Sequence, residues 1–170
     1  ILRYAADRRD QYPCVVTMDA DFSHPPERLP DLVAAMDPPG QSPLDVAIGS
    51  RYVRGGRIEG WPLSRYAMSR AVNFFARWMM GLPPKDCSSG FRCYRTGLLA
   101  RMDFQAISSH GYSFEEEILW RLHRLGARFG EVPIHFVNRR HGSSKINPRE
   151  LVTSLAVLLR LAASRFFARG

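Results

Sequence analysis

Two aspartates, Asp19 and Asp21, follow a short apolar run in the segment VVTMDADFSHPPE (residues 15–27). The apolar run predicts a buried strand, and residues two apart on an extended chain point to the same side. Two carboxylates on one side repel each other unless a cation lies between them, and Mg²⁺ or Mn²⁺ prefers such oxygen ligands. The local pattern leaves an alternative open, in which both aspartates are solvated in a turn or cap a helix that begins at Pro25.

Cationic side chains occur in three further segments of the sequence. The segment GSRYVRGG puts Arg51 at the end of a second apolar run, and WPLSRYAMSR puts Arg65 at the start of a helical pattern. In NRRHGSSK, Arg139 and Lys145 flank a glycine and two serines. One guanidinium group can bind two phosphate oxygens at once, and a loop with cations among short side chains can bind an anion. With a cation site beside them, these segments predict a diphosphate and a second phosphate nearby.

Two other polar segments have ordinary structural explanations. Asp86, Ser88 and Ser89 lie together in DCSSGFRCYR, a pattern that by composition alone is typical of a turn. The segment GYSFEEEILW has three glutamates, two of which are expected to be ordinary acids favoured by the helix dipole. Its Ser113 and Glu116 fit a capping box for a helix that ends near Gly126.

The order of the elements indicates an α/β layered sheet with flanking helices. Strands are expected at residues 14–18, 44–50 and 130–137, with a short one after the Asp86 turn. Helices are expected at 25–36, 64–80, 96–104 and 113–125, the second with Ser64 as its cap. Ligands of open α/β sheets bind at the carboxyl ends of the strands. Asp19 and Arg51 both follow such ends, so we expect them to share one site.

The C-terminal segment ELVTSLAVLLRLAASRFFARG predicts an amphipathic helix. Its longest uncharged run has nine residues (151–159), whereas a span of the bilayer needs about 20 apolar residues. An interfacial helix with Arg160, Arg165 and Arg169 facing lipid phosphates is one interpretation. A terminal helix packed on the sheet is the other, and periodicity alone does not separate them.

The composition is that of a globular domain: 170 residues, 45% hydrophobic and 24% charged. A net charge of +8 suits phosphorylated substrates, anionic membranes and nucleic acid alike. The sequence lacks the basic stripe or aromatic platform of nucleic-acid-binding modules, so no nucleic-acid partner is expected. The five histidines and three cysteines have no zinc-ligand spacing, so zinc catalysis is not expected and the thiols are expected to be reduced.

From about Val15 to Lys145, the order of these motifs resembles that of the dolichol-phosphate mannose synthase family, inverting GT-A glycosyltransferases of family 2. The motifs are MDADFSHPPE, VAIGSRYVRGG, WPLSRYAMSR, DCSSGFRCYR, GYSFEEEI and GEVPIHFVNRRHGSSK. The resemblance implies a GT-A catalytic domain at 1–148 followed by the helix at 149–170. It also implies an enzyme that transfers mannose from GDP-mannose to dolichyl or polyprenyl phosphate with inversion, as a cytoplasmic protein peripheral to the cytoplasmic face of a membrane. Protein partners stay open.

The resemblance also implies roles for particular residues. Asp19 and Asp21 would be the ligands of Mg²⁺ or Mn²⁺ that hold the donor diphosphate. The catalytic residues implied are Asp19, Asp21, Arg51, Arg65 and Asp86. The residues implied to bind phosphate groups or the acceptor are Arg51, Arg65, Ser88, Ser89, Arg139 and Lys145. A phosphate monoester has a second pKa of about 6 and needs no strong general base, which agrees with the absence of an obvious base in the sequence.

The chain departs from the family at two places. Family members open with a strand carrying a P-T-Y-N-E-like motif for the nucleotide base, and the sequence has no match to it, so we expect part of the nucleotide-binding half to be missing. Ser23 stands where some relatives have glutamine beside the metal. Two alternatives therefore stay open: another polyprenyl-phosphate glycosyltransferase that uses a UDP-sugar, and a non-catalytic fragment that binds lipid phosphate or nucleotide.

Overall fold

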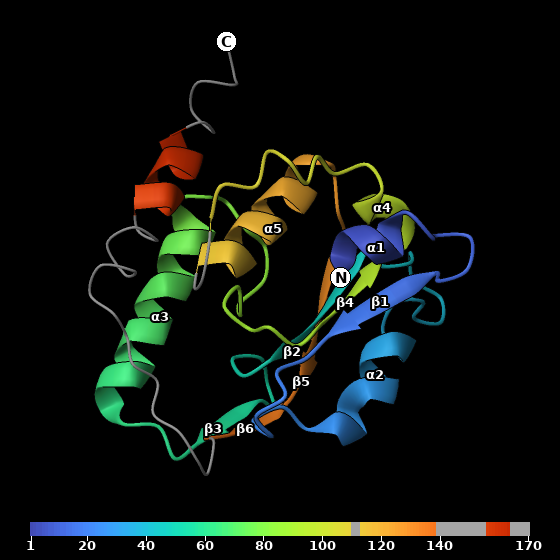
Figure 1. The fold of residues 1–170 in the computed structure, drawn as a ribbon. Coiled ribbons are helices and arrows are strands. Elements are labelled where there is room, and N and C mark those ends of the chain that lie inside the picture. Colours follow the sequence, from blue (N-terminus) through green and yellow to red (C-terminus); the bar gives the residue numbers. More distant parts are fainter. Residues whose placement is uncertain (110–112, 139–155, 164–170) are drawn as a thin grey trace.

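The computed structural model of the protein describes residues 1–109, 113–138 and 156–163 (Figure 1). Residues 156–163 are helical. The other elements, in chain order, are α1 (Leu2–Ala6), β1 (Cys14–Thr17), the 3₁₀ helix η1 (Pro26–Arg28), α2 (Leu29–Ala34), β2 (Val46–Ser50), β3 (Arg57–Glu59), α3 (Leu63–Trp78), β4 (Arg92–Arg95), α4 (Thr96–Leu99), α5 (Phe114–Arg124), β5 (Phe129–Pro133) and β6 (His135–Val137).

The main sheet has the strand order β1-β4-β2-β5. β4 runs antiparallel to β1 and β2, whereas β2 and β5 are parallel. The strands β1, β2 and β5 therefore point the same way, and their carboxyl ends meet at one edge of the sheet. Every residue of the central strand β2 is buried, which explains why its sequence is apolar up to Ser50. The predicted α/β class is confirmed.

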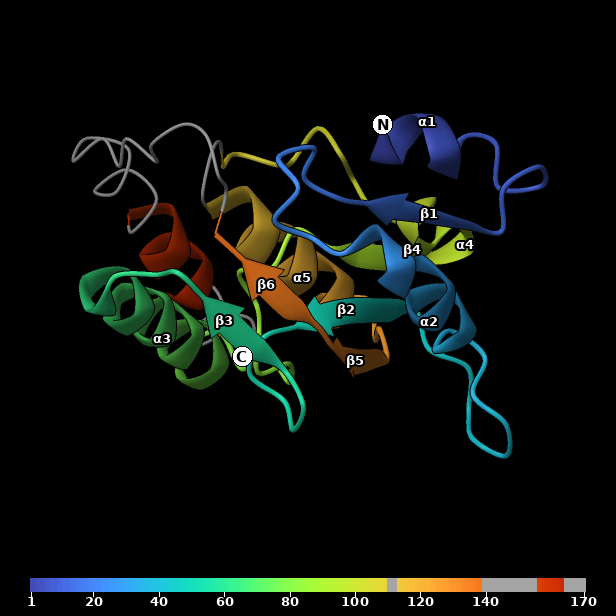
Figure 2. The same cartoon turned by 90° about the horizontal axis from the view of Figure 1, so that it is seen from below.

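Alternate residues of β2 enter two apolar clusters, one on each face of the sheet. Val46 and Ile48 belong to the larger cluster, which also contains residues of α3 and α5. Ala47 belongs to the smaller cluster, which contains Leu32 of α2. The two views agree that α3 and α5 lie toward one side of the molecule and α2 toward the other (Figures 1 and 2). The fold is thus a sheet with helices on both faces.

The single strand predicted at residues 130–137 is wrong, because this segment forms two strands in two sheets. β5 pairs with β2, and β6 pairs in parallel with β3 in a separate two-stranded sheet. The exchange of partners occurs at Ile134, whose N–H donates to Ser50 O (3.0 Å) and whose carbonyl accepts from Arg57 N–H (3.0 Å). The segment that connects β2 to β3 passes so close to the end of β2 that a Cβ on Gly56 would lie 2.6 Å from Ser50 O.

Two predicted helix caps are also corrected. α3 begins at Leu63 after Pro62, so Ser64 lies inside the helix rather than at its cap. Ser113 occupies the N-cap position of α5, but its side chain makes no cap hydrogen bond. Its capping-box partner Glu116 is buried instead. The glycine stop of α5 is confirmed, since Gly126 follows the helix with φ of 83°.

The described part of the C-terminal segment packs on the protein. Leu158, Leu161 and Ala162 are buried in the larger apolar cluster, and the guanidinium of Arg160 donates to Ser108 Oγ (2.8 Å). Both ribbon views place residues 156–163 beside α3 (Figures 1 and 2). Arg165 and Arg169 lie outside the described residues, so the interfacial helix at 149–170 stays a prediction. Among the described helices, none is long and apolar enough to cross a bilayer.

Candidate active site

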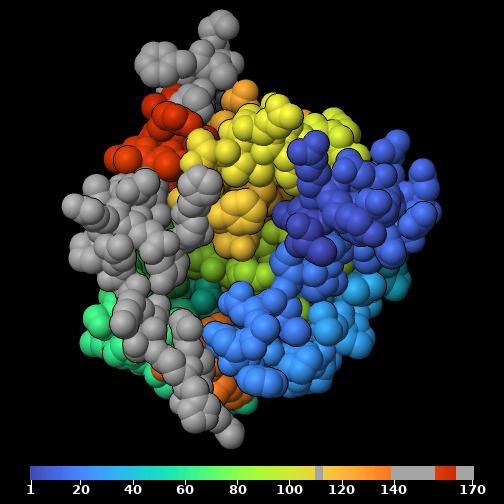
Figure 3. Space-filling view, viewed as in Figure 1, coloured from blue at the N-terminus to red at the C-terminus, as the bar shows by residue number. Residues whose placement is uncertain are grey.

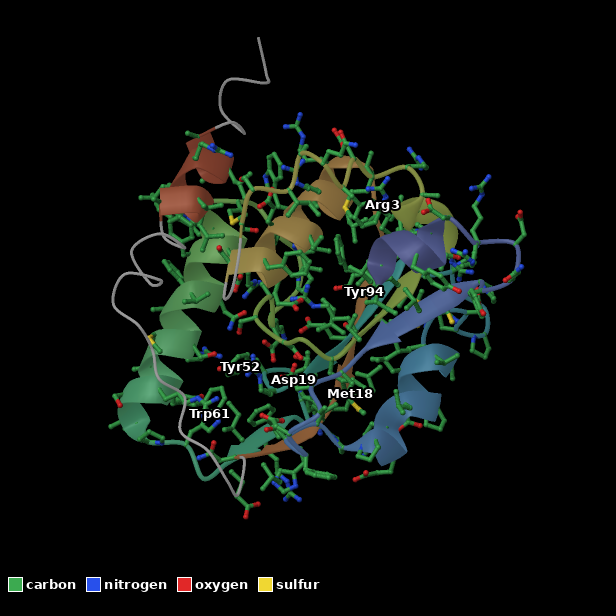
Figure 4. The ribbon with its side chains drawn as sticks, viewed as in Figure 1. Arg3, Met18, Asp19, Tyr52, Trp61 and Tyr94 are labelled. Atoms are coloured by element: carbon green, nitrogen blue, oxygen red, sulfur yellow. The ribbon has the colours of Figure 1, made fainter. Side chains whose placement is uncertain are left out.

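Asp19 and Asp21 lie in a tight turn directly after β1, at the carboxyl edge of the sheet. Figure 4 shows Asp19 at this edge. The side chain of Asp19 is 60% exposed. Asp21 Oδ1 accepts a hydrogen bond from Ser23 N–H (3.0 Å), and Phe22 between them has a positive φ of 62°. The alternative of a turn formed by an aspartate side chain is therefore present in the structure at Asp21. It coexists with an exposed carboxylate at Asp19.

The pair of aspartates fits a hard divalent cation whose other ligands come from elsewhere. Within the described parts of the chain, no group of three or more metal-ligating side chains occurs. Mg²⁺ commonly takes one or two protein carboxylates and completes its coordination with substrate phosphates and water. The exposed carboxylate of Asp19 beside Asp21 matches that chemistry and does not match a closed all-protein site.

The side chain of His24 holds this turn in place. Its Nδ1 accepts the backbone N–H of Asp19 (3.1 Å), and its ring stacks on Phe91 and meets Phe136 edge-on, each at 5.4 Å between centroids. Burial lowers the pKa of His24, and the charge of Arg51 lowers it further, against an upward effect of Asp19. The imidazole is therefore neutral, with Nδ1 unprotonated. The spacing of His24 in the sequence is not that of a metal ligand, and its structural role as an anchor was missed.

Because Gly90 has no side chain, the carboxylates of Asp19 and Glu115 can both lie close to it. A Cβ at this position would lie 3.3 Å from Asp19 Oδ1 and 3.8 Å from Glu115 Oε1. The Gly90 carbonyl accepts a hydrogen bond from Thr17 Oγ1 (2.8 Å), which joins the tip of β1 to the loop of residues 83–91. Glu115 is held in turn by an ion pair with the buried Arg92 (2.8 Å). The edge of the sheet therefore gathers acidic oxygens around a glycine.

Arg51 and Asp86 form a buried, bidentate ion pair. The guanidinium donates from Nε to Oδ2 (2.7 Å) and from Nη2 to Oδ1 (2.6 Å), and the Arg51 backbone N–H also donates to Oδ2 (2.9 Å). Burial alone would lower the pKa of Arg51, but the hydrogen bonds and charge of Asp86 raise it above its ordinary value. The structure thus brings two predicted site residues together. Contact of Arg51 with a phosphate stays a prediction.

Ser88 and Ser89 lie in the same loop but face different partners. Ser88 Oγ accepts from Arg51 Nη2 (2.8 Å) and from Asn73 Nδ2 (3.1 Å). Ser89 is buried, and its hydroxyl donates to the carbonyl of Gly49 (2.7 Å). Ser88 therefore lies in the polar cluster with Arg51, whereas Ser89 pins the loop to the end of β2.

Two residues that the sequence analysis did not single out hold this loop in place. Asn73, buried on the inner face of α3, accepts from Cys87 N–H (2.6 Å) and donates to Ser69 O (2.8 Å). Glu131 of β5 accepts the backbone N–H groups of Lys85 (2.8 Å) and Asp86 (3.0 Å). The one local signal for Asn73 was a polar residue on the buried side of a helical pattern.

Arg65 lies close to this cluster, on the first turn of α3. Its guanidinium donates to Asn138 Oδ1 (2.9 Å) and stacks over the ring of Trp61 at 4.2 Å. Trp61 also lies 5.2 Å from the guanidinium carbon of Arg51, so one indole contacts both arginines. Figure 4 shows Trp61 and Tyr52 on the α3 side of Asp19. The other predicted phosphate-binding residues lie outside the described residues: Arg139 and Lys145.

The three glutamates of α5 have different environments, and the expectation that two are ordinary helix-start acids is wrong. Glu116 is buried beside Arg92, and burial raises its pKa to about 8. Within the described residues, its Oε2 and the Nε of Arg92 have no hydrogen-bond partner. Glu117 behaves oppositely: burial would raise its pKa, but hydrogen bonds from the Ser109 backbone N–H and the Arg121 side chain lower it.

The space-filling view shows the N-terminal residues and α2, in blue, on one side of this face (Figure 3). α3 lies on the other side, in green (Figure 3). Between them, the turn after β1 and the 83–91 loop bring acidic oxygens and arginine side chains to one edge of the sheet. Such a juxtaposition suits a divalent cation with a diphosphate on the Asp19 side and a second phosphate on the Arg51–Arg65 side.

Two curated relatives are similar to most of the chain. The first is the polyprenol monophosphomannose synthase of Mycolicibacterium smegmatis, 40% identical over 151 residues that cover 87% of this chain and 56% of the relative. The second is the undecaprenyl-phosphate mannosyltransferase of Micrococcus luteus, 44% identical over 136 residues that cover 80% of this chain and 54% of the relative. The chain therefore spans about half the length of these relatives.

The family model described as glycosyl transferase family 2 matches residues 2–102, which run from α1 past β4 and include the aspartate turn and the 83–91 loop. The mixed sheet with helices on both faces is the GT-A type of architecture expected from the motifs. The family match and the two relatives thus agree with the resemblance carried by the motif order, and the chain belongs to glycosyl transferase family 2.

Proposed function

We propose that the protein transfers mannose from GDP-mannose to the phosphate of a dolichyl or other polyprenyl lipid, with inversion at the anomeric carbon. The observation that carries the proposal is the single edge of the sheet at which Asp19, Gly90 and the Arg51–Ser88 cluster meet. The two relatives, a polyprenol monophosphomannose synthase and an undecaprenyl-phosphate mannosyltransferase, support the choice of sugar and acceptor class.

On the donor side, Asp19 and Asp21 would hold Mg²⁺ or Mn²⁺ together with the diphosphate of the nucleotide sugar. Such a cation, when bound, supplies neutralising charge for the leaving diphosphate. The chain's own part is to hold the turn rigid, through the hydrogen bond from Asp19 N–H to the neutral His24. Gly90 leaves room for the carboxylates beside it.

On the acceptor side, Arg65, Arg51 and Ser88 would orient the lipid phosphate for attack, together with Arg139 and Lys145. Asp86 acts through Arg51, because its two oxygens fix the guanidinium in one orientation. The acceptor is ionised at neutral pH, with a second pKa of about 6, so orientation matters more than proton removal. The same proposal puts the protein at the cytoplasmic face of a membrane, as a peripheral protein.

A donor panel tests this function. Membranes that contain the full protein are incubated with Mg²⁺, a polyprenyl phosphate and radiolabelled GDP-mannose or UDP-glucose, and the label in extracted lipid is measured. We expect labelled lipid from GDP-mannose, its loss when EDTA is added, and a β-linked product by NMR. Membranes without the protein are the control. If only UDP-glucose labelled the lipid, the donor would be a UDP-sugar, as in the alternative glycosyltransferase. If neither donor labelled the lipid, the proposal would be overturned.

A further inference from the structure

The side chain of Trp61 contacts both arginines on the proposed acceptor side of the site. The guanidinium carbon of Arg65 lies over its ring at 4.2 Å from the centroid, and that of Arg51 lies at 5.2 Å. A cation within about 6 Å of an aromatic centroid is attracted to the electron-rich face of the ring, and most strongly to that of tryptophan. One indole therefore holds close together two cations that would otherwise repel each other.

The indole is itself held by its surroundings. Phe136 of β6, a buried residue, meets it edge-on at 5.3 Å between centroids. Directly before Trp61, the carbonyl of Gly60 accepts a hydrogen bond from Asn138 Nδ2 (3.0 Å). Within the described residues, the buried Nε1 of the indole has no hydrogen-bond partner. Among these residues, Trp61 therefore acts through the face of its ring rather than through its N–H.

The two arginines differ in their other contacts. Arg51 is fixed by the bidentate pair with Asp86, and only 6% of its side chain is exposed. Arg65 is partly exposed, and its Nη1 donates to Asn138 Oδ1 (2.9 Å). A neutral amide oxygen fixes a guanidinium less firmly than a bidentate carboxylate does. We therefore expect the indole to matter more for the orientation of Arg65 than for that of Arg51.

Phe136 also connects the indole to the aspartate turn. Its ring meets the imidazole of His24 edge-on at 5.4 Å, and His24 Nδ1 accepts the backbone N–H of Asp19 (3.1 Å). Three rings in contact thus run from the turn to the arginines. Because protein interiors are close-packed, side chains in direct contact leave little room for relative movement. The arginines that contact Trp61 are thereby fixed relative to the aspartate turn.

We propose that Trp61 is a positioning residue, which holds the guanidinium planes of Arg65 and Arg51 so that both bind one phosphate group of the acceptor. The inference rests on the proposed function for the identity of that acceptor, a polyprenyl phosphate. Trp61 acts through the arginines and not by contact with the reacting atoms. Its contribution is orientation, since a misplacement of about 1 Å at a reacting group can cost on the order of a hundredfold in rate.

Steady-state kinetics of the full protein test this role. Trp61→Leu keeps an apolar side chain but removes the aromatic face, whereas Trp61→Phe keeps a face. We expect Trp61→Leu to raise KM for a short, water-soluble polyprenyl phosphate about tenfold and to leave KM for GDP-mannose unchanged. Trp61→Phe should recover most of the lost acceptor affinity. An equal rise of both KM values, or an unchanged KM for the acceptor, would overturn the proposal.

Trp120→Leu is the matched control. Trp120 is also a partly buried indole approached by two arginines, Arg121 at 6.0 Å and Arg124 at 5.6 Å, but it lies on α5 outside the candidate site. Its replacement removes the same kind of contact and should leave both KM values unchanged. Thermal unfolding shows whether each variant is folded. If Trp120→Leu raised KM for the acceptor as much as Trp61→Leu does, a general loss of stability would explain both effects and the proposal would be wrong.

A double-mutant cycle tests whether Trp61 acts through Arg65. Arg65→Lys keeps the positive charge but loses the planar fork that the indole is proposed to orient. Trp61→Leu should therefore weaken acceptor binding about tenfold in the unaltered protein and less than about twofold in the Arg65→Lys background. Equal losses in the two backgrounds would show that the indole acts independently of Arg65, as in direct contact with the substrate, and would overturn the proposal.

NMR of the arginine side chains tests the shared phosphate without sugar transfer and without a variant, so it holds even if Trp61→Leu does not fold. Inorganic phosphate added to the unaltered protein should shift the Nε–H signals of Arg51 and Arg65 with one common dissociation constant. A response of one arginine alone, or of neither, would overturn the proposal. If both respond but the unaltered protein transfers no mannose to the short polyprenyl phosphate, the proposed function alone is overturned.

Discussion

At the scale of single residues, the site depends on side chains whose partners lie far along the chain. Asp19 and Asp21 are close in sequence, and their turn could be predicted from a strand followed by polar residues. The bidentate pair of Arg51 and Asp86 joins positions 35 residues apart, and local composition indicated only a polar turn at Asp86. Such a pair contributes mainly orientation, because burying both charges costs much of their attraction.

Gly90→Ala tests the close approach of the two carboxylates. The new Cβ would lie 3.3 Å from Asp19 Oδ1, so the carboxylate must shift by a few tenths of an ångström. We expect the affinity for a metal–nucleotide donor to fall about tenfold, with little change in thermal stability. Gly97→Ala is the matched control, because a Cβ there meets nothing within 4 Å. Calorimetric titration with GDP and Mn²⁺ measures the effect, and equal affinities of the two variants would contradict it.

Glu116 gives a prediction about pH. Burial raises its pKa to about 8, so between its ordinary range and about pH 8 the folded chain holds a proton that the unfolded chain has released. Stability from this group is therefore lost as the pH rises through that interval. Glu116→Gln, which cannot ionise, should gain about 2–3 kcal/mol in free energy of unfolding relative to the unaltered chain between pH 5 and pH 8.

The adjacent Glu117 supplies the contrast. Its carboxylate accepts hydrogen bonds from Ser109 N–H (2.8 Å) and Arg121 Nε (2.8 Å), and its pKa is lowered. Glu117→Gln should therefore lower the free energy of unfolding at neutral pH. It should lower this free energy less at low pH, where the carboxylate is protonated in any case. Urea unfolding at several pH values measures both variants. The same pH slope in Glu116→Gln as in the unaltered chain would show that Glu116 is ionised when folded.

At the scale of elements, patterns with local causes were predictable. The apolar run of β2 predicted a buried strand, and the glycine after α5 predicted the end of that helix. The division of residues 130–137 into β5 and β6 could not be predicted, because the chain changes sheets at Ile134 through hydrogen bonds to Ser50 and Arg57, which lie some 80 residues earlier. The buried acid Glu116 was missed for the same reason: an acid near a helix start is ordinarily favoured by local electrostatics.

Asn73 shows how α3 positions the 83–91 loop, and its replacement tests this role. Asn73→Ala removes the partner of Cys87 N–H and of Ser88 Oγ, and leaves a buried donor without a bond. We expect about 2 kcal/mol of lost stability and a larger rise in KM for polyprenyl phosphate than for the nucleotide sugar. Ser64→Ala, on the exposed surface of the same helix, is the control. Steady-state kinetics that vary each substrate separately would contradict the role if both KM values changed equally.

At the scale of the whole molecule, the carboxyl edge of the sheet brings separate segments of the chain to one place. The edge brings the aspartate turn together with the Arg51–Asp86 pair, and α3 carries Arg65 at its start and exposed apolar side chains on its outer face. The sequence predicted the edge from strand order, since ligands of α/β sheets bind at carboxyl ends. It did not separate the inner and outer faces of α3, because both contain apolar residues at helical spacing.

The most direct test of the central claim is mannose transfer by Asp19→Ala in the full protein, with Asp31→Ala on the exposed surface of α2 as the control. The transfer of label from GDP-mannose to a polyprenyl phosphate is measured at saturating Mg²⁺. Because Asp19 is assigned to the cation that neutralises the leaving diphosphate, we predict a loss on the order of a thousandfold in Asp19→Ala and no loss in Asp31→Ala. Unchanged turnover in Asp19→Ala would contradict the assignment of the donor site to the turn after β1.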